Sequence, residues 1–254
     1  MQEISVGNVT EICVFEKVLP RIKKPTMLKF QALLNFQEKT VNNEWEIFLF
    51  PDISLSSFHK KIETKKNFII CNEIEEQQLC DYLEQGKSVI LFGTKPFQKI
   101  RTAFRIACAG RTEGHLATVI NKHSIIKDFP HQGYCGWQFK NMLDGGNSIV
   151  LDLPEKPYYP IIEIASSYKY ARREAVMFEY KVGKGKLFVC SLNLPDNDTG
   201  AVYLKSKIYS YILSEKFSPK NELTIEDIHK LCNLPPVFVI ENSNEACNIN
   251  DVTM

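Results

Sequence analysis

The chain has 254 residues, of which 44% are hydrophobic, and its 31 basic and 30 acidic side chains leave a formal net charge of +1. This length and apolar content predict a sizeable core in one large domain or two small ones. The balanced charge excludes the basic footprint of proteins that bind nucleic acids or anionic membranes. No apolar run reaches the roughly 18–20 residues that cross a bilayer, so we expect no membrane span.

The cysteines and the N-terminus indicate a reducing compartment. None of the eight cysteines forms a CxxC pair, and their spacings fit no zinc template. Residues 1–10 lack the basic segment and apolar block of a signal peptide. Cys71 and Cys190 lie within apolar runs, where free cysteine behaves as a small hydrophobic residue. We therefore expect reduced thiols and a cytoplasmic location.

The first fifty residues predict β-structure. The stretch 27–36 is largely apolar with some alternation, and within 44–50 the alternate residues Trp45 and Ile47 share one face. No helical pattern appears in this part of the chain. We therefore expect a short N-terminal β unit over residues 1–52.

Strand and helix patterns alternate after a polar, lysine-rich stretch at 53–66, which we interpret as a connector. Residues 67–71 predict a short buried strand. A helical pattern follows, for which Asn72 would be the N-cap and Glu75 its return partner. Residues 88–92 predict the next strand. Strand, helix and strand within about 25 residues indicate a βαβ unit and a parallel sheet.

The remaining elements complete an α/β pattern. They are a short helix over 136–143, strands over 148–151, 161–165, 175–181 and 186–192, and helices over 201–213 and from Thr224 and Asp227 onward. A Gly-Lys-Gly turn predicts that the last two strands form a hairpin. Residues 94–135 are less regular. We expect the main α/β domain over 53–220 and a C-terminal helix with a flexible tail over 221–254.

Several short strings occur in a fixed order along the chain. They are NEWEIFLFP at 43–51, HSIIKDFP at 123–130, GYCGWQF at 133–139 and the run 177–194. Together they resemble the C-terminal region of bacterial family 2-type glycoside hydrolases, where the closing strand of a β-sandwich precedes a non-catalytic domain shaped like a class I glutamine amidotransferase. The resemblance covers residues 27–218. It implies a flavodoxin-like, amidotransferase-like three-layer domain.

The resemblance implies a non-catalytic accessory region of such a glycosidase, or a protein derived from one. Its role would be structural, in oligomer assembly or in shaping a sugar cleft, with a carbohydrate, a catalytic barrel or a second copy as partner. A catalytic (β/α)₈ barrel of about 250 residues has no room beside the predicted elements. Two alternatives remain open, a free-standing carbohydrate-binding module and an enzyme with an unrecognised site on the α/β sheet, at the carboxyl edge of its strands.

The sequence offers no catalytic constellation, metal site or cofactor motif. An amidotransferase nucleophile would follow the strand 88–92, where the sequence Gly-Thr-Lys-Pro holds neither Cys nor Ser in a tight turn. His115, His123 and His131 are spaced by eight residues, which matches no helical pair of metal ligands. We interpret them as loop histidines and expect no catalytic residue, no metal and no cofactor.

The candidate binding site is an aromatic cluster. Trp137 and Tyr134 could form a platform for a pyranose ring, because aromatic faces pack against the apolar face of sugars. The resemblance implies His131, Gln138 and Asp144 as its polar neighbours. The alternative interpretation is that Trp137 anchors a short helix onto the sheet.

Overall fold

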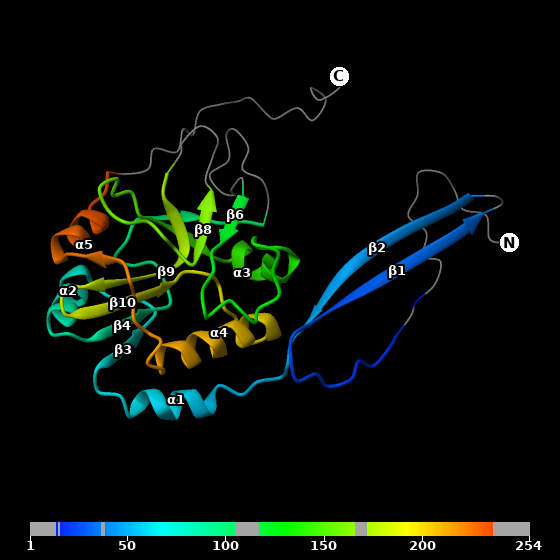
Figure 1. The fold of residues 1–254 in the computed structure, drawn as a ribbon, viewed down its shortest axis with the longest axis horizontal. Helices are drawn as coiled ribbons and strands as arrows, with labels where there is room; N and C mark the ends of the chain where they lie inside the picture. Colours follow the sequence, from blue (N-terminus) through cyan, green and yellow to red (C-terminus); the bar gives the residue numbers. More distant parts are fainter. Residues whose placement is uncertain (1–13, 15, 37–38, 105–116, 166–171, 236–254) are drawn as a thin grey trace, which may run out of the picture.

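The computed structural model describes residues 14, 16–36, 39–104, 117–165 and 172–235. Figure 1 shows an α/β body and a long two-stranded hairpin that projects from it. The α/β class expected from the sequence is confirmed. None of the helices in the described ranges is long and apolar enough to cross a membrane.

A mixed sheet of nine strands runs through the body. The strands are β3 (Phe68–Cys71), β4 (Ser88–Leu91), β5 (Lys99–Arg101), β6 (Ala117–Ile120), β7 (Asn147–Val150), β8 (Ile162–Ala165), β9 (Glu174–Val182), β10 (Gly185–Cys190) and β11 (Glu222–Leu223). Their main order is β3-β4-β10-β9-β7-β5, with β8 and β11 also paired to β9 and β6 paired to β8.

Most of the parallel pairing lies on one side of the sheet, and β11 adds a two-residue parallel pair with β9. β3, β4 and β10 are parallel neighbours, and the helix α2 (Glu76–Glu84) connects the first two, which confirms the predicted βαβ unit. β9 and β10 form the predicted antiparallel hairpin, with Gly183 at a φ of 55° in its turn. β5 to β8 pair antiparallel, so the sheet is mixed rather than wholly parallel.

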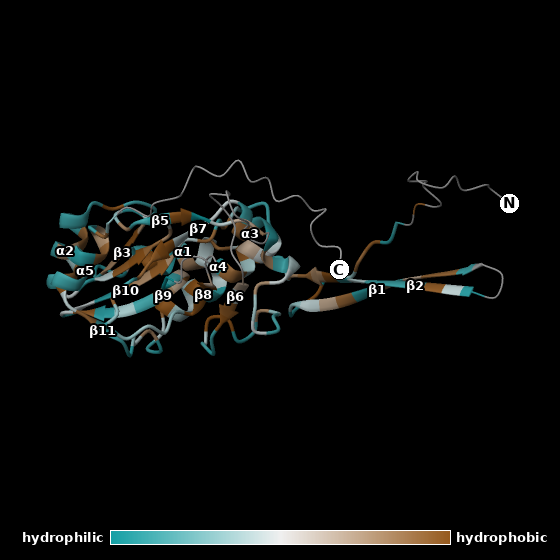
Figure 2. Ribbon diagram, turned by 90° about the horizontal axis from the view of Figure 1, so that it is seen from above, coloured by the Kyte–Doolittle hydropathy of each residue, from teal (hydrophilic) through white to brown (hydrophobic). Residues whose placement is uncertain are grey.

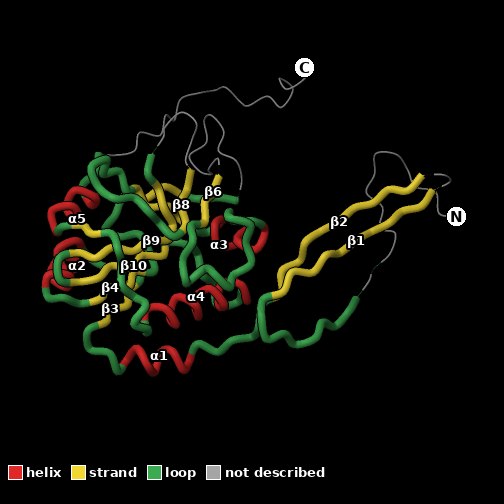
Figure 3. The backbone as a smooth tube through the Cα atoms, in the orientation of Figure 1, coloured by secondary structure: helices red, strands yellow, loops and turns green. Residues whose placement is uncertain are grey.

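Helices pack on both faces of the sheet, as Figure 3 shows by colour. On one face, α2 and α5 (Ile225–Cys232) bury leucines and isoleucines against β4, β9 and β10. On the other face, α3 (Lys140–Asp144) and α4 (Thr199–Ile212) cover the same strands, with α1 (Ser56–Glu63) lying against α4. Two apolar cores therefore lie on either side of one sheet.

Two local predictions were wrong. The stretch 53–66, interpreted as a connector, contains the helix α1, whose half-buried Phe58 packs on Tyr209 of α4 with ring centroids 6.0 Å apart. Glu75 rather than Asn72 is the residue before α2, and it makes no side-chain cap. The stretch 94–135 includes the strands β5 and β6. At α5, by contrast, Thr224 and Asp227 form a complete capping box.

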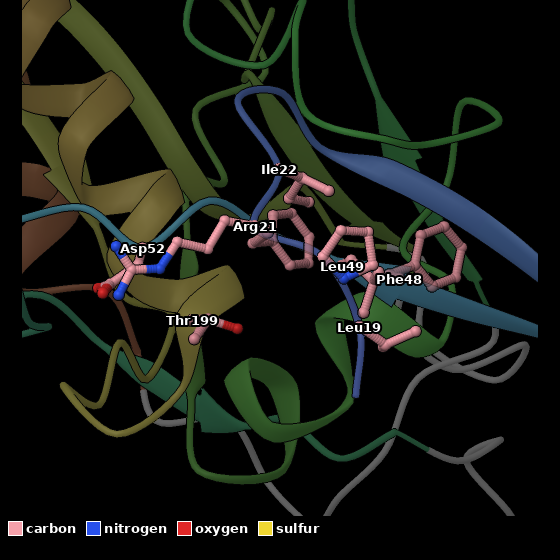
Figure 4. Close-up of a pocket in the computed structure, with 9 residues that line it drawn as sticks. Leu19, Arg21, Ile22, Phe48, Leu49, Asp52 and Thr199 are labelled. Carbon is pink, nitrogen blue, oxygen red and sulfur yellow. The ribbon is translucent and has the colours of Figure 1, made fainter. Parts of the chain in front are cut away.

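The hairpin consists of β1 (Thr26–Phe36) and β2 (Lys39–Leu49), which pair antiparallel along their whole length. Phe50 joins it to the body, with its ring 5.0 Å from Phe129 and 5.7 Å from Tyr203, measured between centroids. A hollow at the hairpin base is lined by the segment 19–22, by β2 and by the start of α4 (Figure 4). In that view Arg21 points toward Asp52. The hairpin base is thus packed against the body.

Candidate functional site

The predicted aromatic cluster begins with Trp137, which lies on a 3₁₀ turn, η1 (Trp137–Phe139), just before α3. Its side chain is 68% exposed, and its ring lies 5.0 Å from that of Phe104. Phe139, two residues later, is completely buried and packs against Phe129. Phe139 together with Met142 and Leu143 anchors this turn and helix, so the interpretation of Trp137 as the anchor is wrong.

Asp144 supports the Phe104–Trp137 ring pair through two hydrogen bonds of its carboxylate. One carboxylate oxygen accepts a hydrogen bond from the backbone N–H of Phe104 at 2.6 Å. The other accepts from the Lys140 ammonium at 2.7 Å. The carboxylate therefore fixes the backbone that holds Phe104 beneath Trp137, and the structure gives Asp144 a positioning role in this cluster.

Two other predicted site residues flank Trp137 in the chain, Tyr134 in the turn that leads to η1 and Gln138 within η1. Tyr134 is 51% exposed and its hydroxyl donates to Gln132 Oε1 at 3.1 Å. Gln138 is half-buried, and its amide donates to the carbonyl of Pro130 at 2.5 Å. Within the described part of the chain its Oε1 is buried without a hydrogen-bond partner. Gln138 thus braces the turn, while Tyr134 and Trp137 present aromatic surface to solvent.

His131 belongs to a different hollow, of about 420 Å³, which it lines together with His123. In both imidazoles Nδ1 accepts a backbone N–H from two residues further on, at 3.0 Å for His131 and 3.3 Å for His123. The neutral His131 ring therefore carries its proton on Nε2. Burial lowers the pKa of His131, which favours that neutral form. Among the described residues, no hydrogen bond, ion pair or ring contact joins His131 to Trp137.

Two of the three histidines singled out in the sequence, His123 and His131, lie within the described residues. His115, the first of the three histidines, lies outside the described residues. Over the described ranges no group of three or more His, Cys, Asp or Glu side chains could hold a metal ion.

One polar cluster escaped the sequence analysis. Tyr211 of α4 donates to the Glu179 carboxylate of β9, 2.9 Å from both oxygens, and His123 Nε2 lies 3.6 Å from the same group. Burial, followed by the charge of Glu179, raises the pKa of the Tyr211 hydroxyl. The available signal was Glu179 itself, a charged residue between Phe178 and Tyr180 in the otherwise apolar stretch 175–180. Its partners are 56 and 32 residues away and carried no signal.

The carboxyl ends of β3 and β4 border a hollow of about 480 Å³. It is lined by Asn72, Glu73, Phe92, Gly93, Thr94, Lys95, Pro96, Phe97 and Lys99. Among these residues there is no Cys, Ser or His that could serve as a nucleophile–base pair. Lys95, which the sequence places where an amidotransferase nucleophile would lie, pairs with Glu75.

The neighbouring strand β10 ends in Cys190, and this thiol is not activated. Cys190 is completely buried, and burial raises its pKa to about 12. A reactive cysteine needs a lowered pKa and access to solvent. The next residue, Ser191, is also buried and its hydroxyl bonds to the carbonyl of Val176 at 3.3 Å. Neither group is therefore poised as a nucleophile.

These features define a mixed α/β protein with an exposed aromatic cluster and an added β-hairpin. The chain belongs to the family described as a domain of unknown function, DUF8487, whose match covers residues 69–233. That range runs from β3 to α5 and does not include the hairpin or α1. None of the curated proteins compared with the chain matches it.

Proposed function

We propose that this chain is a non-catalytic accessory region of a family 2-type glycoside hydrolase, or derived from one, and that it presents Trp137 to a sugar. The exposed Trp137 ring, supported from behind by Phe104, is the observation that carries the proposal. Burial is the normal state of so large an apolar side chain, and a solvent-facing ring on a rigid support suits a ligand with an apolar face.

The rigidity of the support matters because binding to a preorganised surface costs less conformational entropy. Phe104 is held through its backbone by Asp144, and η1 is held by the buried Phe139. Tyr134 adds a second exposed aromatic ring from the adjoining turn. A pyranose ring offers an apolar face for stacking and hydroxyls for nearby polar groups.

The accessory role rests on the sequence resemblance and on the chemistry of the strand ends. The helices on both faces and the β3-α2-β4 unit support an amidotransferase-like, flavodoxin-like shape, although the antiparallel strands β5 to β8 depart from a wholly parallel sheet. The hollow beyond β3 and β4 lacks a nucleophile–base pair among its lining residues, which favours a non-catalytic role.

Tryptophan fluorescence tests the sugar contact, because the chain has only two tryptophans, Trp45 and Trp137. In a Trp45→Phe background, emission reports on Trp137 alone. We expect a saturable change in emission on titration with galactosides or glucosides, and loss of binding by calorimetry in Trp137→Ala. Tyr159→Ala, which removes another exposed aromatic ring, is the matched control and should bind normally.

Other outcomes of these experiments would contradict the proposed function. An emission that stays constant with every galactoside and glucoside, or equal loss in the Tyr159→Ala control, would rule out the platform. Turnover of an aryl glycoside or an ester by the purified chain would rule out a purely accessory role. It would favour an enzyme with its site at the hollow beyond β3 and β4.

A further inference from the structure

The projecting hairpin has one apolar face and one polar face. Strand pairing places Leu28 opposite Ile47, Phe30 opposite Trp45 and Leu34 opposite Val41, and alternation puts all of these on the same side. The Phe30 and Trp45 rings lie 5.5 Å apart. We call this set, with Ala32 and Asn43 between its members, the apolar face.

The opposite side of the hairpin is polar and internally satisfied. Lys29 donates to one oxygen of Glu44 at 2.6 Å, and Gln31 donates to the other at 2.7 Å. Asn35 accepts from Thr40 at 2.8 Å. Three apolar residues also lie on this side: Leu33, which is 65% exposed, and the facing pair Met27 and Phe48 at the base. The contrast between the two sides is typical of a sheet with one buried face.

The apolar face is nevertheless open in this structure. Leu28 at the base is half-buried, and the other large apolar members are exposed, from 45% for Ile47 to 61% for Val41. Figure 2 shows the hairpin as an arm that extends away from the body, with apolar segments along it. A two-stranded hairpin is marginally stable in water by itself, and three or more strands or a packed face are needed. The apolar face therefore requires a covering surface.

We propose that the covering surface is the same apolar face of a second copy of the chain. The apolar face between Leu28 and Ile47 at one end and Leu34 and Val41 at the other carries no charge, so two copies meet without repulsion. The charged side chains between these ends, Lys29, Glu44 and Glu46, lie on the polar side, and Lys39 lies beyond Val41 at the tip of the hairpin. Because the hairpin projects from the body, two hairpins can lie antiparallel with the bodies at opposite ends.

A two-fold axis across the hairpin centre gives a specific register. It lies between the Phe30–Trp45 pair and the Ala32–Asn43 pair, which is also midway between the hairpin's base and tip. The bulky aromatic pair of each copy then faces the small Ala32–Asn43 step of the other, as interdigitating cores require. Ile47 of each copy faces Val41 of the other. The sheets would stack about 10 Å apart.

The area is sufficient for a specific pair. The exposed parts of five large side chains on the face amount to about 500 Å² per copy, or about 1,000 Å² for both, the lower limit for a specific interface. The members are Phe30, Leu34, Val41, Trp45 and Ile47. Trp and Phe at the centre are residue types that dominate interface energies. This inference does not depend on sugar binding at Trp137.

Sedimentation equilibrium of the full chain tests the proposal. We expect a species of twice the 29.2 kDa chain mass. Val41→Lys or Ile47→Glu should each weaken the dimer about thirty-fold or more, because each sets a charge against an apolar side chain of the facing copy. Leu33→Glu is the matched control for Ile47→Glu, because it adds the same negative charge to the polar side of the same hairpin. It should leave the dimer intact.

Mixing the two face variants tests the register. In a mixed pair, Glu at 47 of one copy faces Lys at 41 of the other, so equal amounts of Val41→Lys and Ile47→Glu should restore a dimer that neither forms alone. A wild-type chain that sediments as a monomer overturns the proposal, because its apolar face is then not covered by a second copy. So does equal dissociation of the Leu33→Glu control, or failure of the mixture to associate. Circular dichroism of each variant confirms that the body is folded.

Discussion

At the scale of single residues, the buried ionisable groups divide into two kinds. Glu179 and Asp227 are held by specific donors, Tyr211 for the first and Lys156 and Thr224 for the second. Cys135 and Cys190 are instead buried among apolar side chains. Burial disfavours the thiolate, and it raises the pKa of each thiol to about 12. These cysteines therefore behave as small core residues.

The raised pKa of Cys190 predicts a loss of stability in alkali. Its ordinary value is 9.0 and its folded value is about 12, so between these pH values the unfolded chain releases a proton that the folded chain retains. The folded chain therefore has its full stability, as far as this thiol is concerned, below pH 9. Above pH 9 the free energy of unfolding falls by about 1.4 kcal/mol per pH unit for each such thiol. Cys190→Ala should flatten this decline in urea unfolding measured from pH 8 upward, by about that slope.

Cys71→Ala provides the comparison, because Cys71 is only partly buried and lies at a strand end. Its removal should change the alkaline slope less than the removal of Cys190. An alkaline slope that is the same in wild type and Cys190→Ala would show that the Cys190 thiol ionises normally in the folded chain.

At the scale of elements, the turn between β9 and β10 shows how close packing limits the sequence. Gly183 has a positive φ and open space around it, whereas Gly185 is buried against the connection from α2 to β4. A Cβ at Gly185 would lie 2.7 Å from the carbonyl oxygens of Leu83 and Lys87. Backbone atoms cannot move aside as a side-chain end can. Gly185 is therefore the more restrictive of the two glycines.

Gly185→Ala should accordingly lower the free energy of unfolding by about 1–3 kcal/mol, the usual cost of overpacking. Gly183→Asn is the matched control, because Asn tolerates the left-handed conformation and meets no neighbouring atom there. It should cost less than about 1 kcal/mol. Urea unfolding of both variants decides the point, and equal losses would contradict the packing argument.

Elements with a local signal were predictable, and those without one were not. The βαβ unit, the Gly-Lys-Gly hairpin and the α5 capping box each carry their signal within a few adjoining residues. In the helix α1, no local helix signal outweighs the lysines and serines of its sequence. The helix is instead held in place by Phe58 and Ile62, which pack against the core around α4. β5 and β6 are three and four residues long and depend on β7 and β8 for pairing.

The same distinction applies to the candidate site. The sequence identified the aromatic residues but not which of them faces inward, because that depends on how η1 packs. The structure buries Phe139 and exposes Trp137. It also places His131 beside His123 in the lining of one hollow. Contacts between residues far apart in sequence, such as His123 with Glu179, left no local pattern to find.

At the scale of the whole molecule, the body and the hairpin are built on separate sheets. The two-stranded sheet of β1 and β2 shares no strand pairing with the nine-stranded sheet, and its apolar face contributes to neither buried core. The family match likewise begins at residue 69, after the hairpin. The hairpin meets the body mainly where Phe50 packs on Phe129 and Tyr203. The body therefore has the content of an independently folding unit.

A chain that begins at residue 53 should consequently fold on its own. Loss of Phe50 uncovers part of Phe129 and Tyr203, so we expect a decrease of about 1–3 kcal/mol in the free energy of unfolding, but a cooperative transition and an unchanged far-UV spectrum of the body. Because the apolar face is then absent, the truncated chain should sediment as a monomer at every concentration. A truncated chain that is unfolded would show that the hairpin is part of the folding unit, and one that still dimerises would place the dimer contact on the body.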